Sequence, residues 1–597
     1  MTRRVAFLIG AALFAPSVLL AAVTLDFPEG PLNLSNAPQI GAAGGEALSL
    51  RLDPRGGVVV RRGETEQRVA ESSRSGGVIS LPVLYVDGAG VHVFWRVKLS
   101  APVAELGNPG DKLIYVRSST DGGKSFGPPH RLNQQGGAFQ PRTAGNGQGA
   151  VYTVWPDERF RMYHVYLNRT TDGGKTWQAR DTQVDVRPEK EGGAYDPVLA
   201  ATGDHVWVAW AEGDFPASQM PAGATPQASR GHRGQTPSAK LVPFVVLLRR
   251  STDRGETWSD PVRVAEPTGQ PFSTVFLRAS GSLLLYWFTE QGFAGVKSGD
   301  DGRTWTAVTG FPKVEQIEGL TGAVDPASGR IILAYGVDRE GQRPALWVTS
   351  SPDGMQFDAP VPLPTKTPHL TTAVLPEIVP GKDGTVMALW QDSRYIRSTV
   401  CARLSKDGGR TWLERDTCLE ESPGKFHAFF PKGAADGAGG FFTQWVRYTD
   451  DRLQKVEVVL TRVDPGRLPA PPDPREASQA RLEERVGGFW KTRVAADWSG
   501  SYAFMDPIFR SRVRREAYIG SQGVVKYYDF KIEKLDVTER IAKATVRYTF
   551  EIPELEVQGK RHVVPKRDEP TTQEWIFVDG DWHLVFKDLM NQTFFRY

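Results

Sequence analysis

The chain has few cysteines, few histidines and no marked excess of charge of one sign. Its 597 residues include two cysteines and nine histidines, and its formal net charge is +3. No group of Cys and His has the spacing of metal ligands, so we expect neither a structural metal nor a cofactor. A dense basic stripe is also missing, which leaves binding to nucleic acid without electrostatic support.

The two cysteines, Cys401 and Cys418, lie on either side of a short motif, Ser405 to Trp412. One falls on the strand that enters the turn and the other lies beyond it. In an oxidising compartment this position favours a cross-strand disulfide. The alternative is a pair of free buried thiols.

The N-terminus is typical of an exported protein. Arg3 and Arg4 precede an apolar stretch from Val5 to Val23, so we predict a signal peptide over residues 1–22. An uncleaved anchor is the alternative, because large leucines stand where a cleavage site prefers small residues. In both cases the body of the chain is expected outside the cytoplasm, in the periplasm or secreted. If the signal peptide is cleaved, no membrane span is expected to remain.

An eight-residue motif, Ser/Thr-x-Asp-x-Gly-x-Thr-Trp, is the strongest signal in the chain, because self-similar repeats determine architecture. Its Asp bonds backbone N–H groups ahead of it, its Gly tolerates positive φ, and its Trp covers the turn. The copies are Thr170–Trp177, Ser251–Trp258, Ser298–Trp305 and Ser405–Trp412, with a softer copy at Ser119–Phe126 and a decayed one at Ser350–Phe357. Their aspartates are Asp121, Asp172, Asp253, Asp300 and Asp407.

These copies resemble the Asp-box, or BNR repeat, of the sialidase superfamily. The resemblance implies a β-propeller in which each box lies on the turn between the third and fourth strands of a blade, away from the catalytic face. It says little about activity, since one scaffold carries many functions.

Short apolar strands that end in an aromatic residue allow the blades to be counted. They end at Trp95, Trp155, Trp210, Trp287, Tyr335, Trp390 and Trp445. We therefore predict an all-β propeller of seven blades over residues 47–467, with six blades, as in sialidases, as the alternative. In this interpretation the segment Ala47–Val69 supplies the outer strand that closes the ring.

A second domain is expected after a Pro-rich linker over residues 468–475. Residues 476–597 begin with an amphipathic helical pattern and continue with strand-like segments. This order resembles the nuclear-transport-factor-like cone fold, a small α+β domain that often holds a pocket. The aromatic residues of the segment fit such a pocket, but they fit an ordinary core better.

The sialidase resemblance implies three arginines on a substrate carboxylate, an Asp acid, and a Tyr nucleophile paired with a Glu. The Phe-Arg-Ile-Pro signature that carries the first arginine in that family is absent here. The remaining candidates are Arg142 at the start of an inner strand, and Arg159 and Arg394 in a repeated Trp-x-Asp-x-Arg pattern. Asp196 or Glu318 is the candidate for proton transfer. Repetition of the pattern favours the alternative that it forms a structural Asp–Arg pair.

Other residues near the expected channel mouth complete the set of candidates. Tyr195 adjoins Asp196, and neighbours on a strand point to opposite faces unless a bulge intervenes. Further acids and histidines there are Glu315, Glu377, His369 and His427. An insertion over residues 212–240, without apolar periodicity, is expected on the same face as a lid, a docking arm or passive decoration.

Three functions follow from these features. The first is a scaffold whose channel face binds a glycan or an envelope protein, which the missing arginine signature favours. The second is an exo-sialidase-type glycoside hydrolase acting on acidic sugars at the same face. The third is an activity carried by the C-terminal domain, with the propeller only positioning it.

Overall fold

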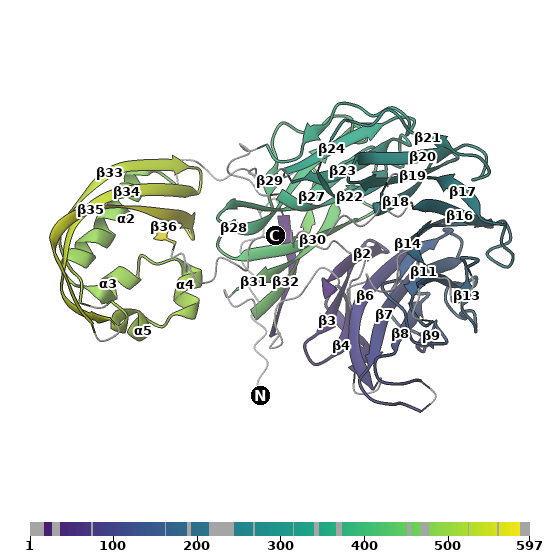
Figure 1. The fold of residues 1–597 in the computed structure, drawn as a ribbon, viewed down its shortest axis with the longest axis horizontal. Helices are drawn as coiled ribbons and strands as arrows, with labels where there is room; N and C mark the ends of the chain where they lie inside the picture. The colour runs from purple at the N-terminus through teal and green to yellow at the C-terminus, as the bar shows by residue number, and fades with distance from the viewer. Residues whose placement is uncertain are drawn as a thin grey trace.

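The computed structural model shows a mostly β chain in two parts (Figure 1). The residues that it describes are 17–26, 36–72, 76–104, 106–160, 163–187, 193–213, 244–266, 269–314, 316–338, 345–365, 373–449, 455–466, 468, 477–522, 524–557 and 560–585.

The propeller contains eight four-stranded antiparallel sheets among the described residues. The first four are β2 (Gln39–Ala43), β3 (Glu46–Asp53), β4 (Gly57–Arg62) and β5 (Thr65–Glu71); β6 (Gly77–Asp87), β7 (Gly90–Leu99), β8 (Lys112–Ser119) and β9 (His130–Arg131); β10 (Arg142–Gly145), β11 (Val151–Asp157), β12 (His164–Thr170) and β13 (Thr182–Gln183); and β14 (Ala194–Thr202), β15 (His205–Glu212), β16 (Val245–Ser251) and β17 (Val262–Ala265).

The remaining four sheets follow the same order along the chain. They are β18 (Phe272–Ala279), β19 (Ser282–Thr289), β20 (Gly292–Ser298) and β21 (Thr306–Ala307); β22 (Ile317–Val324), β23 (Ile331–Val337), β24 (Ala345–Ser351) and β25 (Val361–Pro362); β26 (Ala373–Pro380), β27 (Val386–Tyr395), β28 (Arg397–Ser405) and β29 (Thr417–Cys418); and β30 (His427–Ala435), β31 (Phe441–Tyr448), β32 (Lys455–Val463) and β1 (Ser17–Asp26).

The first strands of successive sheets contact one another, and β30 of the last sheet contacts β2 of the first, which closes the ring. The prediction of seven blades, with six as the alternative, was therefore wrong by at least one sheet. The segment Ala47–Val69 is not an outer strand but most of a complete sheet. It escaped the count because β3 ends in no aromatic residue and no Asp-box follows β4.

The outer strand of the last sheet comes from the N-terminus. Strand β1 pairs antiparallel with β32, from Ser17 opposite Val463 to Asp26 opposite Lys455. This strand overlaps the end of the predicted signal peptide, residues 1–22, whose earlier part lies outside the described residues. The signal peptide stays a prediction.

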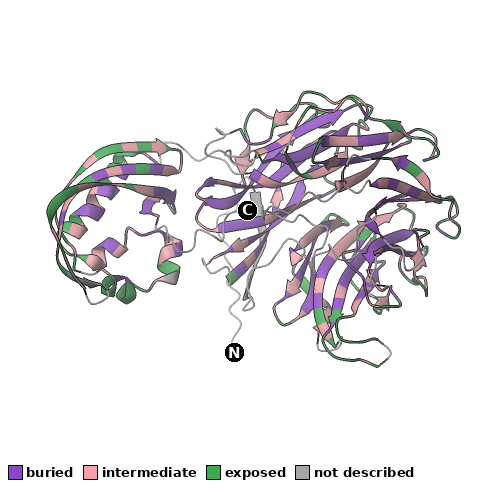
Figure 2. Ribbon diagram, in the orientation of Figure 1, coloured by how far each residue is buried: buried purple, intermediate pink, exposed green. Residues whose placement is uncertain are grey.

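The aromatic-ended strands are the second strands of their sheets. Their aromatic residues are at most 4% exposed, and Figure 2 shows buried positions running along the middle strands. Wide, flat side chains at equivalent positions help to fill the space between neighbouring sheets, and each buries a large apolar surface. The buried residues are Trp95, Trp155, Trp210, Trp287, Tyr335, Trp390 and Trp445.

Each Asp-box lies between the third and fourth strands of its sheet, and the box at Asp300 illustrates the bonding. Asp300 Oδ1 accepts from the backbone N–H of Thr304 at 2.9 Å, and Thr304 Oγ1 donates to Asp300 Oδ2 at 2.6 Å. Ser298 Oγ donates to Asp300 Oδ1 and accepts from the backbone N–H of Gly302. Because these bonds favour the ionised carboxylate, the hydrogen bond from Thr304 foremost, the pKa of Asp300 is lowered to about 2.

Cys401 and Cys418 form a disulfide. They are direct cross-strand partners on β28 and β29, the strands on either side of the box from Ser405 to Trp412. The bridge therefore ties a two-residue outer strand to the fully buried third strand of its sheet.

The C-terminal part combines a four-stranded antiparallel sheet with helices. The helices are α2 (Gln479–Val494), α3 (Trp498–Tyr502), α4 (Pro507–Arg512) and α5 (Arg515–Gly520), and the strands are β33 (Lys526–Thr538), β34 (Ile541–Val557), β35 (Lys560–Val578) and β36 (Asp581–Leu584). The predicted apolar face of α2 is buried against the sheet, and Trp490, Tyr518 and Trp575 belong to this core. The resemblance to the cone fold stays a prediction, and the linker is almost entirely outside the described residues.

The two parts meet where β27 turns into β28 (Figure 1). Arg397 Nη2 donates to Asp506 Oδ1 at 2.7 Å, and both side chains are at most 7% exposed. Asp506 also caps the N-terminus of α4. The hydroxyl of Tyr395 donates to Glu539 Oε2 at 2.9 Å. The C-terminal domain is thus docked through a buried ion pair rather than joined by the linker alone.

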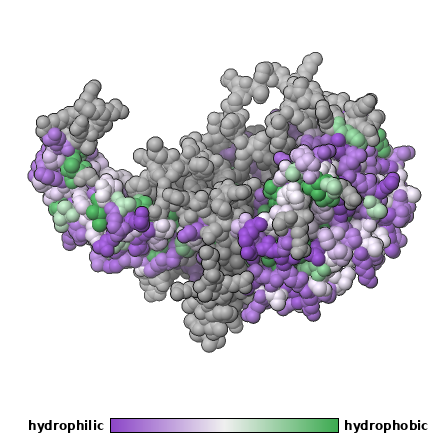
Figure 3. All heavy atoms as spheres, turned by 90° about the horizontal axis from the view of Figure 1, so that it is seen from below, coloured by the Kyte–Doolittle hydropathy of each residue, from purple (hydrophilic) through white to green (hydrophobic). Residues whose placement is uncertain are grey.

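The coloured part of the surface in Figure 3 is mainly hydrophilic, with hydrophobic residues scattered over it. Of the helices that the structure describes, none is long and apolar enough to cross a membrane.

Candidate functional site

The channel face is the side of the ring at which the inner strands begin. Five inner strands of the described chain carry a non-glycine residue with φ between 44° and 56° near that end, each within a β-bulge. A left-handed conformation costs such a residue about 1–2 kcal/mol, and a bulge redirects side chains. These residues are Leu81, Asp196, Ser273, Leu375 and Phe430. Four of them precede a proline.

Arg142 and Asp196 are brought together on this face, from the neighbouring inner strands β10 and β14. Arg142 Nη2 lies 3.6 Å from Asp196 Oδ1, and their side chains are 52% and 21% exposed. The bulge between Tyr195 and Val198 separates the two adjacent side chains. Tyr195 is buried, whereas Asp196 reaches Arg142. The bulge that both side chains would need in order to serve one centre is present, but Tyr195 is buried.

A tyrosine with a carboxylate partner lies beside Tyr195 and was missed in the sequence. The ring of Tyr163 lies 5.4 Å from that of Tyr195 and 5.3 Å from that of Phe139. Burial, then the charge of Glu158 and a hydrogen bond to it, raise the pKa of Tyr163 to about 12. Tyr163 is therefore protonated at neutral pH and acts as a hydrogen-bond donor. Its only sequence signal was its position shortly after the Trp155–Arg159 pattern.

Arg159 does not join the channel-face pair. It is 5% exposed and donates to Asp157 at 2.8 Å and to Asp181 at 2.5 Å. The indole of Trp155 donates to the same Asp157 carboxylate at 3.1 Å. Burial lowers the pKa of Arg159, but its hydrogen bonds to the two carboxylates outweigh burial and raise the pKa above its ordinary value.

Arg394 repeats this arrangement in another sheet. Its Nη2 donates to Asp392 at 2.6 Å and also to Asp416, and the arginine is 3% exposed. Trp390 Nε1 donates to Asp392 Oδ2 at 2.9 Å. We call each of these Trp–Asp–Arg–Asp sets, at Arg159 and at Arg394, a clamp. The sequence analysis gave a structural Asp–Arg pair as the alternative interpretation of the repeated pattern. Arg159 and Arg394 both form such a pair with the Asp of the pattern.

The remaining acids lie apart from Arg142. Glu318 is exposed near the start of β22, and the inner strand β18 separates β22 from the strand that carries Asp196. Glu377 binds Lys432 Nζ at 2.6 Å and accepts from the backbone N–H of Gly433 at 2.9 Å. His427 is buried, and burial foremost lowers its pKa to about 3. These groups therefore have structural surroundings of their own.

Several predicted features lie outside the described residues: Glu315, His369 and nearly all of the insertion over residues 212–240. Within the described ranges, no group of three or more His, Cys, Asp or Glu side chains is arranged to hold a metal ion.

Comparison with known proteins gives a matching family over part of the chain and a distantly similar sialidase. Residues 243–429 match the family described as BNR repeat-like domain. A sialidase of Bacteroides fragilis (strain YCH46) is 24% identical over 382 residues, which are 56% of this chain and 67% of that protein.

The solved structures that resemble the chain do so weakly. An intramolecular trans-sialidase from Ruminococcus gnavus, in complex with oseltamivir carboxylate, is 13% identical with a TM-score of 0.34, and the likeness covers 67% of this chain and 97% of that one. An α-L-arabinanase from Penicillium chrysogenum, complexed with arabinobiose, is also 13% identical with a TM-score of 0.33, over 56% of this chain and 98% of that one.

Proposed function

We propose that this chain, which has the BNR-repeat fold of the sialidase superfamily, acts outside the cytoplasm as a scaffold whose channel face binds a glycan or an envelope protein. The observation that carries this proposal is that two of the candidate substrate arginines are already paired with buried carboxylates. Arg159 and Arg394 each already bind two buried carboxylates. Turning either guanidinium toward a ligand would leave buried charges unpaired, at a cost of about 3–5 kcal/mol.

The exposed pair of Arg142 and Asp196 supports binding of a polar, uncharged group. A guanidinium donates hydrogen bonds and a carboxylate accepts them, so the pair matches two neighbouring hydroxyls of a sugar. Tyr163 lies on the same side, with its hydroxyl hydrogen-bonded to Glu158. Because Arg142 is already compensated by Asp196 at 3.6 Å, a second anion gains less from it than a neutral diol does.

Binding to a glycan array tests the scaffold directly. The wild-type chain is compared with Arg142→Ala and with Arg410→Ala, an exposed arginine of an Asp-box on the opposite face. We expect the first substitution to weaken binding at least about tenfold, since it removes charge-assisted hydrogen bonds. The control should bind as wild type. Equal binding by all three proteins would refute a glycan site at Arg142.

A hydrolase of sialidase type is the second candidate, favoured by one observation. Arg142, Asp196 and the Tyr163–Glu158 pair lie on neighbouring sheets at one face. In such an enzyme Arg142 would hold the substrate carboxylate and Asp196 would transfer the proton. Glu158 would take the proton of a Tyr163 nucleophile. Turnover that depends on Arg142 would favour this candidate over the scaffold.

A further inference from the structure

The C-terminal domain contacts the channel face at the sheet that carries the disulfide. The second and third strands of each sheet are joined on the face where the inner strand begins, so the turn between β27 and β28 lies on that face. In this turn Arg397 Nη2 donates to Asp506 Oδ1. The hydroxyl of Tyr395 donates to Glu539 Oε2. Arg394, the arginine of the clamp, directly precedes Tyr395. The clamp and the domain contact therefore share one turn.

The clamp also connects this turn to the disulfide. Arg394 Nη2 donates to Asp416. Asp416 directly precedes β29, an outer strand of two residues, in which Cys418 is bonded to Cys401 of β28. The disulfide, β29, Asp416, Arg394 and the domain contact thus form one continuous series. Each member is joined to the next by the chain or by a bond between side chains.

The clamp at Arg159 has a different support at the positions of the two cysteines. Tyr166 and Gln183 are cross-strand partners on β12 and β13, as Cys401 and Cys418 are on β28 and β29. Tyr166 and Cys401 each stand opposite the tryptophan of their clamp on the neighbouring strand. The Arg159 guanidinium lies 3.6 Å from the centre of the Tyr166 ring, which is a cation–π contact. In the other clamp the disulfide takes the place of this aromatic support.

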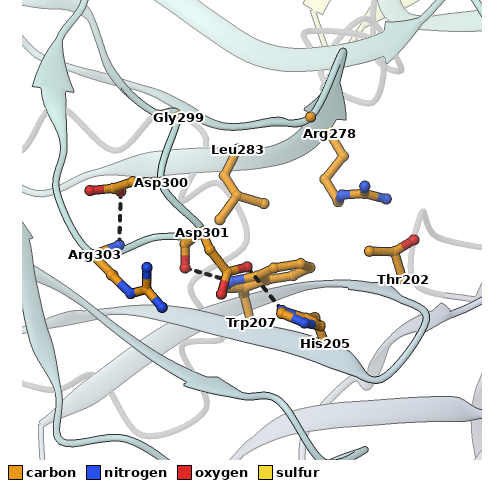
Figure 4. A pocket seen from close by; sticks show the side chains of 10 residues that line it. Thr202, His205, Trp207, Arg278, Leu283, Gly299, Asp300, Asp301 and Arg303 are labelled. Carbon is orange, nitrogen blue, oxygen red and sulfur yellow. Dashed lines mark hydrogen bonds and ion pairs between the residues drawn. The ribbon is translucent and has the colours of Figure 1, made fainter.

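The Asp-boxes hold the outer strands at their other end without any disulfide. In the box after β20, the Asp301 carbonyl accepts from Trp207 Nε1 at 3.2 Å, and the carboxylate lies 3.0 Å from His205 of the same preceding sheet (Figure 4). In the box after β28, the backbone N–H of Gly408 donates to the carbonyl of Gly384 at 2.8 Å. Loss of the disulfide therefore leaves the box in place and frees the part of the outer strand beside the clamp aspartate.

We propose that the disulfide is a redox-sensitive latch that holds the C-terminal domain against the channel face. A dithiol reductant attacks Cys418, which is half-buried on the outer strand, whereas Cys401 is fully buried. The bond between the two Sγ atoms breaks, and two electrons and two protons pass from the dithiol to the cysteines. The products are two cysteine thiols and the disulfide of the reductant. Strand β29 then loses its covalent tie, Asp416 separates from Arg394, and the turn that holds the domain loosens. This latch does not depend on which ligand the channel face binds.

The proposal is tested by hydrogen–deuterium exchange with mass spectrometry on the full chain, oxidised and after reduction with dithiothreitol. We expect reduction to speed exchange in residues 506–512 at least about tenfold, because charge-assisted bonds that hold this segment closed are weakened. Exchange in β11 and β12, the sheet of the other clamp, should not change. Unchanged exchange in residues 506–512, when alkylation shows both cysteines to be free thiols, would overturn the proposal. Equal acceleration in both sheets would overturn it too, because the loosening would then be general.

Variants test the connection through the clamp. The double variant Cys401→Ser, Cys418→Ser should exchange without reductant as the reduced wild type does. Asp416→Asn should speed exchange in residues 506–512 with the disulfide intact, whereas the matched Asp181→Asn in the other clamp should not. Exchange as in the oxidised wild type for Asp416→Asn, or the same acceleration for Asp181→Asn, would show that the clamp does not connect the disulfide to the domain contact.

Discussion

Replacing Arg394 by alanine should destabilise the propeller while leaving the channel face intact. The substitution leaves Asp392 and Asp416, both at most 1% exposed, without their shared cation. Breaking a buried pair in this way costs about 3–5 kcal/mol. With an unfolding entropy of about 2.1 cal/mol/K per residue over roughly 450 residues, this cost lowers the thermal midpoint by about 3–5 °C.

The exposed arginine provides the matched comparison. Arg142→Ala removes an ion pair whose arginine is 52% exposed, so it should change the stability by at most about 1 kcal/mol. Differential scanning calorimetry of both variants measures the two midpoints, and the glycan array measures their binding. A normal midpoint for Arg394→Ala together with lost ligand binding would refute the reasoning, because the arginine would then serve a ligand rather than a clamp.

Three further predictions concern pH, the disulfide and the domain contact. The pKa of Asp300 is about 2 against an ordinary 3.8, so its contribution to stability is complete above about pH 4 and is lost as the pH falls toward 2. Urea midpoints that stay constant between pH 5 and pH 2 would contradict this. Alkylation without reductant should label neither Cys401 nor Cys418, and reduction should lower the thermal midpoint, since closing a loop of this length contributes about 3 kcal/mol. Asp506→Ala leaves Arg397 without its carboxylate partner in the domain contact and should speed proteolysis between the domains. An unchanged cleavage rate would argue against a stabilising buried ion pair at this contact.

Features determined within a few residues could be predicted from the sequence. An Asp-box forms its hydrogen bonds within eight residues, as Asp300 and Thr304 show. Its motif therefore predicts both the turn and the place of that turn in the chain. The short apolar segments that end in an aromatic residue were likewise correctly predicted as strands. The first sheet carries neither mark, although short turns join its strands, and the blade count was wrong there.

The candidate site depends on contacts that local patterns do not contain. The Trp-x-Asp-x-Arg pattern indicated one partner of each clamp arginine, but the second partners, Asp181 and Asp416, lie 22 residues further on. The meeting of Arg142 and Asp196 requires both neighbouring inner strands and a bulge. The sequence patterns identified these residues as candidates. Which of them contact one another follows from the arrangement of the sheets in the closed ring.

The measurement that tests the central claim most directly is turnover of a fluorogenic sialoside by the purified wild-type chain, beside Arg142→Ala and Arg410→Ala. The scaffold account predicts no turnover by any of the three folded proteins, while the array shows binding that depends on Arg142. Turnover by the wild type and by Arg410→Ala that disappears in Arg142→Ala would contradict it and establish an enzyme at the channel face.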